Sequence, residues 1–283
     1  MERAILLIQC PDKKGIVAKV SEFVFRNDGN IINSDQYSTD PEGGRFFMRL
    51  EFSFDARQNH RRDLENGLAE LARSLDARWE IHYSDTVMNM GILASKSDHC
   101  LVDLLYRRRS GELRVSVPFV ASNHEDLRAV VEQHGIAFHY LPVKKETRHA
   151  QEQEILNLAT GATDFLVLAR YMQILSNEFL SAYPHDIINI HHSFLPSFKG
   201  ANPYQQAYDR GVKLIGATAH YVSAELDEGP IIEQLVERVT HKENIEDLRR
   251  KGRNLEKLAL ANAIHAHLQH RIIRFKNKTI VFA

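Results

Sequence analysis

The chain has 283 residues, 43% of them hydrophobic, and a formal net charge of -1, which allows one large or two ordinary domains with apolar cores. The neutral balance offers no basic excess for nucleic-acid binding. The sequence contains neither a signal-peptide core nor the run of ~20 apolar residues that a membrane span needs. Its two cysteines, Cys10 and Cys100, form neither a disulfide framework nor a zinc knuckle. We expect a cytoplasmic protein that binds no nucleic acid and enters no membrane.

The first 85 residues alternate between strand and helix patterns. Strands are expected at residues 4–8, 31–38, 46–54 and 79–83, and helices at 16–24 and 64–75. From Phe46 to Phe54 every second residue is large and apolar, so one face of this strand should be buried and the other exposed. Turn-forming residues at 40–44 join it to the preceding strand as a hairpin. The order βαββαβ predicts a ferredoxin-like, ACT-like unit.

From residue 86 the pattern restarts as a second domain. Apolar strands are expected at 88–94, 115–120, 138–141, 165–169 and 187–190, with helices at 101–105, 127–131 and 155–158 between them. This alternation predicts a Rossmann-like, mostly parallel sheet covered on both faces, hence an α/β protein. Two strands at 214–222 and 231–239, a long helix at 245–268 and a hairpin at 271–282 should follow. We predict two domains, 1–85 and 86–283.

Two polar side chains lie at the end of the strand expected at 187–190. Residues two apart on a strand face the same way, so Asn189 and His191 project together. They lie at the carboxyl end of a strand in an open α/β sheet, where ligand crevices form. A carboxamide N–H beside an imidazole suits an oxygen that gains negative charge during acyl transfer. Asp227, on a tight loop after a later strand, is a candidate for handling the nucleophile's proton.

Structural interpretations compete with this one. An Asn and a His at a strand end are more often structural than catalytic, and an Asp before Glu-Gly-Pro commonly forms a turn. Spacing alone therefore leaves the role of the trio open.

Four motifs in the second domain resemble the formyltetrahydrofolate-dependent formyltransferase family. They are Asn-Ile-His at 189–191 with the loop 193–200, Gly-Ala-Thr-Ala-His at 216–220, Leu-Asp-Glu-Gly-Pro-Ile at 226–231, and the strand and loop at 164–175. They occur in the family's order across most of residues 88–240. The resemblance implies that the catalytic set is Asn189, His191 and Asp227. It also implies that no metal or cofactor is required and that the folate is the substrate.

The same resemblance places the folate on two loops. The loops at 171–175 and 222–227 would surround the pterin, largely through backbone groups. Gly200 would permit close approach of the formyl end, and His220 would lie behind the catalytic residues. The implied substrate-binding residues are Tyr171, Met172, Gln173, Ile174, Leu175, Gly200, Val222 and His220.

The first domain distinguishes between members of that superfamily. Its first turn, Pro-Asp-Lys-Lys-Gly-Ile at 11–16, resembles that of an ACT domain, a module that binds small amino acids. An ACT domain followed by a formyltransferase-like domain resembles the formyltetrahydrofolate deformylase family over the whole chain. Glycinamide ribonucleotide formyltransferases lack an ACT domain, and no residues remain for the C-terminal barrel of methionyl-tRNA formyltransferases.

A local departure from the transferase pattern favours water as the acceptor. Where the ribonucleotide transferase has a Gly-rich phosphate-binding turn, residues 94–100 contain no glycine. The expected reaction is hydrolysis of 10-formyltetrahydrofolate to formate and tetrahydrofolate, which feeds one-carbon and purine metabolism. Asp227 would deprotonate the water, His191 and Asn189 would stabilise the oxyanion, and His191 would pass a proton to the departing folate nitrogen.

Three alternatives are kept beside hydrolysis. The first is a folate-dependent transferase that acts on an amine such as glycinamide ribonucleotide. The second is metal-dependent hydrolysis, which is disfavoured because the adjacent His191 and His192 point to opposite sides of an extended segment. The third is an amino-acid sensor with an inactive enzyme domain, which the intact trio disfavours.

The ACT-like domain predicts regulation and assembly. Asp12 and Gly15, in the turn before the first helix, are candidate effector-binding residues, although Asp12 equally suits a helix cap. By resemblance, glycine and methionine are the candidate effectors. Exposed sheet edges favour pairing with another subunit, so we expect a homo-oligomer.

Overall fold

The computed structural model describes residues 2–40, 43–55, 61–197 and 203–283. The chain forms two compact units. The first unit comprises Met1–Val87, Gln269–Phe275 and Ile280–Ala283, and the second unit comprises Met88–Leu268 and Lys276–Thr279. The domain boundary expected after residue 85 stays a prediction. In the described ranges no helix is long and apolar enough to cross a membrane.

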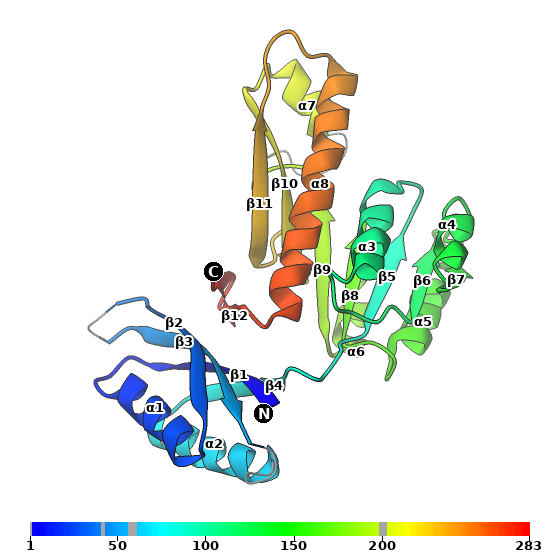
Figure 1. Ribbon diagram of the computed structural model, residues 1–283. Helices are drawn as coiled ribbons and strands as arrows, with labels where there is room; N and C mark the ends of the chain where they lie inside the picture. The colour runs from blue at the N-terminus through cyan, green and yellow to red at the C-terminus, as the bar shows by residue number, and fades with distance from the viewer. Residues whose placement is uncertain (1, 41–42, 56–60, 198–202) are drawn as a thin grey trace. The chain divides into compact units, whose positions relative to one another are not determined.

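The first unit contains a four-stranded antiparallel sheet in the order β2-β3-β1-β4, with α1 and α2 on one face (Figure 1). Its elements are β1 (Glu2–Pro11), α1 (Ile16–Arg26), β2 (Asn30–Ser38), β3 (Arg45–Phe54), α2 (Arg61–Leu75) and β4 (Arg78–Tyr83). Leu6, Leu50 and Leu64 belong to the core between this sheet and the helices. The βαββαβ order expected from the sequence is confirmed.

The other face of this sheet is also covered, which the alternating pattern of β3 did not predict. Phe47 and Arg49 lie on that face, and both are buried. Two C-terminal strands follow α8 in the chain: β12 (Ile272–Phe275) and β13 (Lys278–Val281). Ile273 on β12 and Phe282, directly after β13, pack against Phe47. Arg49 Nε and Nη2 donate hydrogen bonds to the carbonyls of residues 270 and 269, each at 3.2 Å. The expected exposed face is therefore wrong, because a segment distant in the sequence covers it.

The second unit contains a seven-stranded sheet in the order β11-β10-β9-β8-β5-β6-β7. Its strands are β5 (Met90–Ala94), β6 (Phe119–Ser122), β7 (Ala137–Tyr140), β8 (Phe165–Ala169), β9 (Asp186–His191), β10 (Leu214–Tyr221) and β11 (Ile231–Arg238). Its helices are α3 (His99–Ser110), α4 (Arg128–Gln133), α5 (Arg148–Ala159), α6 (Asn177–Ala182), α7 (Pro203–Asp209) and α8 (Ile245–Leu268). Strands β5 to β9 are parallel, whereas β10 runs antiparallel to both neighbours. The mostly parallel α/β fold is confirmed.

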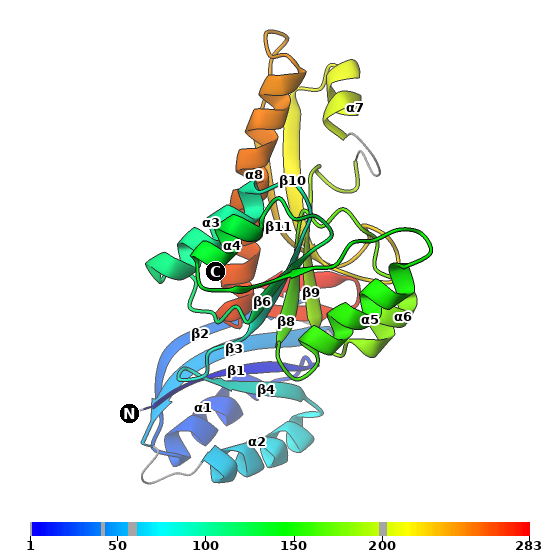
Figure 2. The ribbon, with the colours of Figure 1, turned by 90° about the vertical axis from the view of Figure 1, so that its right-hand side faces the viewer.

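The arrangement of this sheet places the carboxyl ends of β5, β8 and β9 side by side. The chain builds β5, β6 and β7 in one direction and then returns to add β8 and β9 on the other side of β5. Ligands bind at such a switch point in open α/β sheets. Helices α3 and α8 cover one face and α5 and α6 the other (Figure 2). A ligand site is therefore expected at the carboxyl ends of β8 and β9.

Two details differ from the sequence-based expectation. The strand expected at 115–120 begins at Phe119, since Ser116 makes only an isolated bridge to Asn89. Helices α6 and α7 were not expected, because each is too short to show an apolar period. In α6 the hydroxyl of Ser176 accepts a hydrogen bond from the Phe179 N–H, an N-cap that starts the helix.

Candidate active site

The structure brings Asn189, His191 and Asp227 together at the end of β9. Asn189 and His191 lie on β9, and Asp227 lies in the loop between β10 and β11. His191 Nδ1 is 3.3 Å from Asp227 Oδ2. Because β10 pairs with β9 in antiparallel register, His220 stands opposite Asn189, and Asn189 Nδ2 is 3.2 Å from His220 Nε2. Of the predicted site residues, these four therefore form one polar cluster.

The loop that carries Asp227 has a conformation set by its own sequence. Asp227 adopts φ 56°, in the left-handed region that Asp tolerates better than most residues. Two residues later, a Cβ on Gly229 would lie 1.7 Å from the carbonyl oxygen of Tyr221, so only glycine fits there. The N–H of Tyr221 donates to the carbonyl of Pro230 at 2.9 Å and closes the loop. The Asp-Glu-Gly-Pro motif thus returns the chain to β11 with Asp227 facing His191.

Hydrogen bonds determine which atoms of Asn189 and His220 donate. His220 Nδ1 is 2.9 Å from the carbonyl oxygen of Tyr221 and can only donate to it. Burial lowers the pKa of His220, so the ring is neutral and its Nε2 accepts a hydrogen bond from Asn189 Nδ2. This fixes the carboxamide orientation of Asn189 and leaves its second N–H available to another acceptor.

Half-buried Asp227 and buried His191 form an acid–imidazole pair. Burial raises the pKa of Asp227, but the hydrogen bond and charge of His191, together with His220, outweigh it and hold that pKa below its ordinary value. The carboxylate is therefore ionised and accepts the Nδ1–H of His191. The opposite ring atom, His191 Nε2, is buried and makes no hydrogen bond with the described residues. It is therefore the ring nitrogen whose hydrogen-bonding capacity is unused among the described residues.

The loop after β9 is tied to the neighbouring strands. Buried Thr218 on β10 donates through Oγ1 to the carbonyl of Ser193 at 2.9 Å and accepts from the N–H of Leu195 at 3.0 Å. Gln234 Nε2 on β11 donates to the carbonyl of Leu195 at 2.9 Å. Sequence reasoning missed this support, although a threonine within the apolar run of β10 was a visible signal. Gly200, predicted to contact the formyl end, lies outside the described residues.

The predicted folate-contacting loop after β8 has a mixed exposure. Tyr171 and Leu175 are buried in one apolar cluster, and Val222 from the other predicted loop packs against the same cluster. Met172 and Ile174 are 60% and 58% exposed, and Gln173 is half-buried. The two predicted loops are therefore neighbours. Their contact with a folate stays a prediction.

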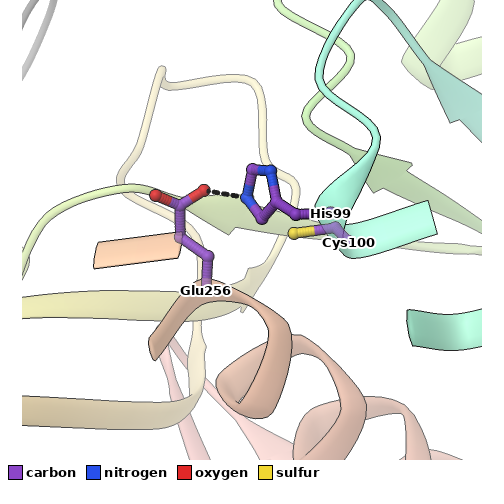
Figure 3. Close-up of side chains that lie close together, drawn as sticks. All are labelled: His99, Cys100 and Glu256. Carbon is purple, nitrogen blue, oxygen red and sulfur yellow. Dashed lines mark hydrogen bonds and ion pairs between the residues drawn. The ribbon is translucent and has the colours of Figure 1, made fainter. Parts of the chain in front are cut away.

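A second buried polar cluster lies at the start of α3. The side-chain ligand atoms of His99, Cys100 and Glu256 lie within 4.8 Å of one another, which makes them a candidate metal group among the described residues (Figure 3). Their surroundings do not suit a cation. Burial raises the pKa of Cys100 well above its ordinary value, so it stays a thiol, and Arg170 Nε already lies 3.3 Å from Glu256 Oε2. The cluster is better described as an internal ion pair.

His192 lies between the two clusters. Its ring centroid is 5.4 Å from that of His191 and 5.9 Å from that of Tyr204. Burial, together with the charge of Arg170, lowers the pKa of His192 to about 3. The ring is therefore neutral in the folded protein at any pH above this value.

This neutral histidine should make the second unit less stable in mild acid. The unfolded chain takes up a proton at His192 below its ordinary pKa of 6.5, whereas the folded protein does so only near 3. This stability is therefore fully present well above pH 6.5 and is lost as the pH falls through 6.5, by about 1.4 kcal/mol between roughly pH 7.5 and 5.5. Urea unfolding followed by circular dichroism measures this loss, since the one tryptophan, Trp79, lies in the first unit. An unchanged pH slope in His192→Asn would contradict the assignment.

The predicted effector residues lie at the start of α1. Gly15 has φ 89° and occupies the N-cap position, a left-handed conformation that glycine adopts without strain. Asp12 accepts a hydrogen bond from the hydroxyl of Ser38, and its N–H donates to the carbonyl of Gly44 at 2.9 Å. Asp12 thus joins the turn to the β2–β3 hairpin rather than capping α1. Its contact with an effector stays a prediction.

Family models match both units of the chain. Residues 88–264 match the model described as Formyl transferase, and residues 4–70 match the model described as ACT domain. The fold and the cluster at the end of β9 thus define an enzyme of the formyl transferase type joined to an ACT domain.

Individual relatives indicate which family within this class the chain belongs to. A protein named formyltetrahydrofolate deformylase from Synechocystis sp. is 52% identical over 99% of this chain and 98% of its own length. Its namesake from Bacillus subtilis is 49% identical over 99% and 94%. The crystal structure of a formyltetrahydrofolate deformylase from Pseudomonas syringae pv. tomato superposes with a TM-score of 0.93 at 45% identity, covering 100% of this chain and 95% of that one. The chain belongs to the formyltetrahydrofolate deformylase family.

A transferase is a more distant neighbour. The structure of glycinamide ribonucleotide transformylase 1 from Symbiobacterium toebii superposes with a TM-score of 0.64 at 28% identity. The superposition covers 71% of this chain and 97% of the transformylase chain. Deformylases therefore match this chain over its whole length, and that transferase matches only part of it.

Proposed function

We propose that this enzyme hydrolyses 10-formyltetrahydrofolate to formate and tetrahydrofolate. The observation that carries this proposal is the His191–Asp227 pair on the same strand face as Asn189: His191 Nε2 is buried without a hydrogen bond to the described residues, and His220 orients the Asn189 carboxamide. The relatives named formyltetrahydrofolate deformylase, which match over the full length, support the same reaction. Such a reaction feeds one-carbon and purine metabolism. It needs no cofactor, because the folate itself is the substrate.

The reaction begins with attack of water on the formyl carbon. His191 Nε2 takes a proton from the water as its oxygen bonds to carbon, and Asp227 stabilises the imidazolium that forms. The formyl oxygen becomes an oxyanion, which accepts the spare N–H of Asn189. The bond from carbon to N10 then breaks, N10 takes the proton from His191, and formic acid leaves and ionises to formate in water. His220 keeps Asn189 in the required orientation.

In this mechanism His191 accepts the proton of the water, whereas the sequence-based expectation gave that step to Asp227. The lowered pKa of Asp227 makes its carboxylate a weak base, and its Oδ2 already accepts from His191. An imidazole nitrogen can accept a proton and return it, which suits both steps of the hydrolysis. The geometry therefore favours His191 for the proton transfers and Asp227 for orientating the ring.

Internal bonds in the loop after β5 support water as the acceptor. Ser95 Oγ lies 2.6 Å from Asn123 Oδ1 and also bonds to the carbonyl of Tyr171. Further on, His99 Nε2 donates to Glu256 Oε2 at 2.8 Å. Ser95 and His99 thus have partners within the chain, and the partner of His99 is a buried carboxylate. Such surroundings disfavour the phosphate of a ribonucleotide acceptor.

Formate release from 10-formyltetrahydrofolate without any amine tests the proposal. Steady turnover that survives a chelator is the expected result. Formyl transfer that begins only when glycinamide ribonucleotide is added would identify a transferase instead. Loss of turnover on chelation would identify a metal-dependent hydrolase, and no turnover under any condition would favour an amino-acid sensor.

For the ACT unit we propose a regulatory role. In this proposal residues 1–85 form the regulatory domain and residues 86–283 the catalytic domain, with Asp12 and Gly15 close to a bound glycine or methionine. Strand β2 is an edge strand that exposes Ile31, Ile32 and Tyr37, which favours pairing with a second copy in a cytoplasmic homo-oligomer. Turnover measured with each amino acid, and the mass in solution, test these two points. Unchanged turnover with both amino acids would remove the effector assignment.

A further inference from the structure

Two carboxylates are buried among the described residues, and both hold the segment 170–176 that follows β8. Glu152 on α5 is 5% exposed and Glu256 on α8 is 1% exposed. A buried carboxylate is costly unless its oxygens are bonded, so its position is informative. Both glutamates lie in the second unit and reach this segment from helices on opposite faces of the sheet.

Glu256 holds the beginning of the segment. Its Oε2 is 3.3 Å from Arg170 Nε and accepts from His99 Nε2 at 2.8 Å, while its Oε1 accepts from the Tyr204 hydroxyl at 2.5 Å. Figure 3 shows the His99 contact. Burial raises the pKa of Glu256, but the bond from His99 and the charge of Arg170 outweigh it, so the carboxylate is ionised. Arg170 Nε and Nη1 are buried without a hydrogen bond to the described residues, so Glu256 holds Arg170 through the charge of the ion pair.

Glu152 holds the end of the segment. Its Oε1 accepts the backbone N–H of Ser176 at 2.9 Å, and its Oε2 accepts the Ser176 hydroxyl. Glu152 Oε1 also bonds Arg148 Nε at 3.3 Å, and Arg148 Nη2 donates to the carbonyl of Ile174. Glu152 therefore fixes two points of the backbone, one directly and one through Arg148.

The backbone between these points is strained. Arg170 and Met172 have φ of 60° and 59°, the left-handed region that costs free energy for a residue with a Cβ. Such conformations persist only where the surroundings hold them, and they cluster at ligand sites. Here the buried rings and chains of Tyr171 and Leu175 add to the two carboxylates, while Met172 and Ile174 remain exposed. The segment thus presents apolar side chains on a fixed backbone.

We propose that Glu152 and Glu256 are positioning residues for the substrate, which clamp the two ends of segment 170–176 in its binding conformation. This inference rests on the proposed function, in which that segment contacts the folate. Preorganising a loop lowers the ordering cost of binding, so the clamp should act on KM more than on kcat.

Glu152→Gln and Glu256→Gln test the clamp, because each removes the charge with little change in volume. We expect each variant to raise KM for 10-formyltetrahydrofolate about tenfold, with a smaller change in kcat. In the double variant the effects should not multiply, since the first change already loosens the segment. Changes at independent, distant sites usually have additive free energies, so their effects on KM multiply. A KM increase of about 100-fold in the double variant would therefore overturn the shared clamp. An unchanged KM in either folded single variant would also overturn it.

Hydrogen exchange of the 170–176 backbone provides a readout that needs no turnover. Faster exchange of this segment is expected in both Gln variants, and exchange as in the wild type would overturn the proposal. The matched control is Glu243→Gln, which breaks an ion pair to Lys251 at 2.7 Å in the same unit and should leave KM and this exchange unchanged. A wild type that releases no formate would refute the proposed hydrolysis, while the exchange data would still test the clamp.

Milder variants cover the case in which a Gln variant does not fold. Tyr204→Phe removes one hydrogen bond to Glu256, and Ser176→Ala removes the hydroxyl that bonds Glu152. Each should raise KM by a few-fold and speed exchange in segment 170–176. An unchanged KM together with unchanged exchange in both would overturn the proposal equally.

Discussion

Asp227→Asn is expected to reduce the rate of formate release by about 10³- to 10⁴-fold. The carboxylate at 3.3 Å accepts the Nδ1–H of His191, and in the proposed reaction it stabilises the imidazolium that forms during attack. A carboxamide carries no charge, and its N–H₂ can turn towards the ring and favour the opposite tautomer. His191 Nε2 then carries the hydrogen and can no longer take a proton from water. Initial rates with saturating 10-formyltetrahydrofolate measure the loss.

The control for this change lies next to it in the sequence. Glu228 is exposed, so Glu228→Gln removes one negative charge from the same loop at a solvated position. Its rate should stay within about threefold of the wild type, because exposed charges contribute little. Folate binding by Asp227→Asn should also persist. Near-normal turnover of Asp227→Asn would remove Asp227 from the mechanism.

His191→Ala is expected to reduce formate release by about 10²- to 10⁴-fold, because one imidazole performs both proton transfers in the proposed reaction. Its Nε2 is buried and makes no hydrogen bond with the described residues, so removing the ring leaves that position without a base. Added imidazole should restore part of the rate if the cavity left by the side chain admits it. Initial rates with and without imidazole measure both effects.

His192→Asn distinguishes a specific role of His191 from a general need for histidine at this strand end. The two rings are adjacent, but His192 faces Tyr204 and is kept neutral by burial and by Arg170. Its loss should therefore change the rate by less than about tenfold and alter mainly the pH dependence of stability. Equal losses in the two variants would contradict the assignment of the proton transfers to His191.

Local pattern was enough to predict most elements of both units. Each of the patterns used lies within a single segment, where side-chain spacing reports directly on the buried face. They are the alternation in β3, the apolar runs of β5, β8 and β9, and the helical periodicity along α8. The same logic failed for Phe47 and Arg49, which are buried by residues more than 200 positions away. Short helices such as α6 were missed because six residues span fewer than two helical turns, too few to show an apolar repeat.

For the site, spacing alone predicted that Asn189 and His191 share a face, because residues two apart on a strand always do. The motif order across the second domain implied the partnership with Asp227, but not its atoms. Which nitrogen of His191 meets the carboxylate depends on the left-handed turn at Asp227 and on Gly229 packing against Tyr221. These are contacts between β10, β11 and β9, and local pattern does not specify them.

The sequence by itself therefore determined the order of elements, the class of fold and the identity of the polar trio, since these depend on periodicity and on short motifs. Only the tertiary structure decided which atoms of those residues meet. It turned His191 Nδ1 towards Asp227, left His191 Nε2 unbonded in the described chain, and placed Glu152 and Glu256 at the two ends of segment 170–176. The physical reason is that protonation, hydrogen bonding and backbone strain depend on partners far apart in the chain, which meet only when the sheet is assembled.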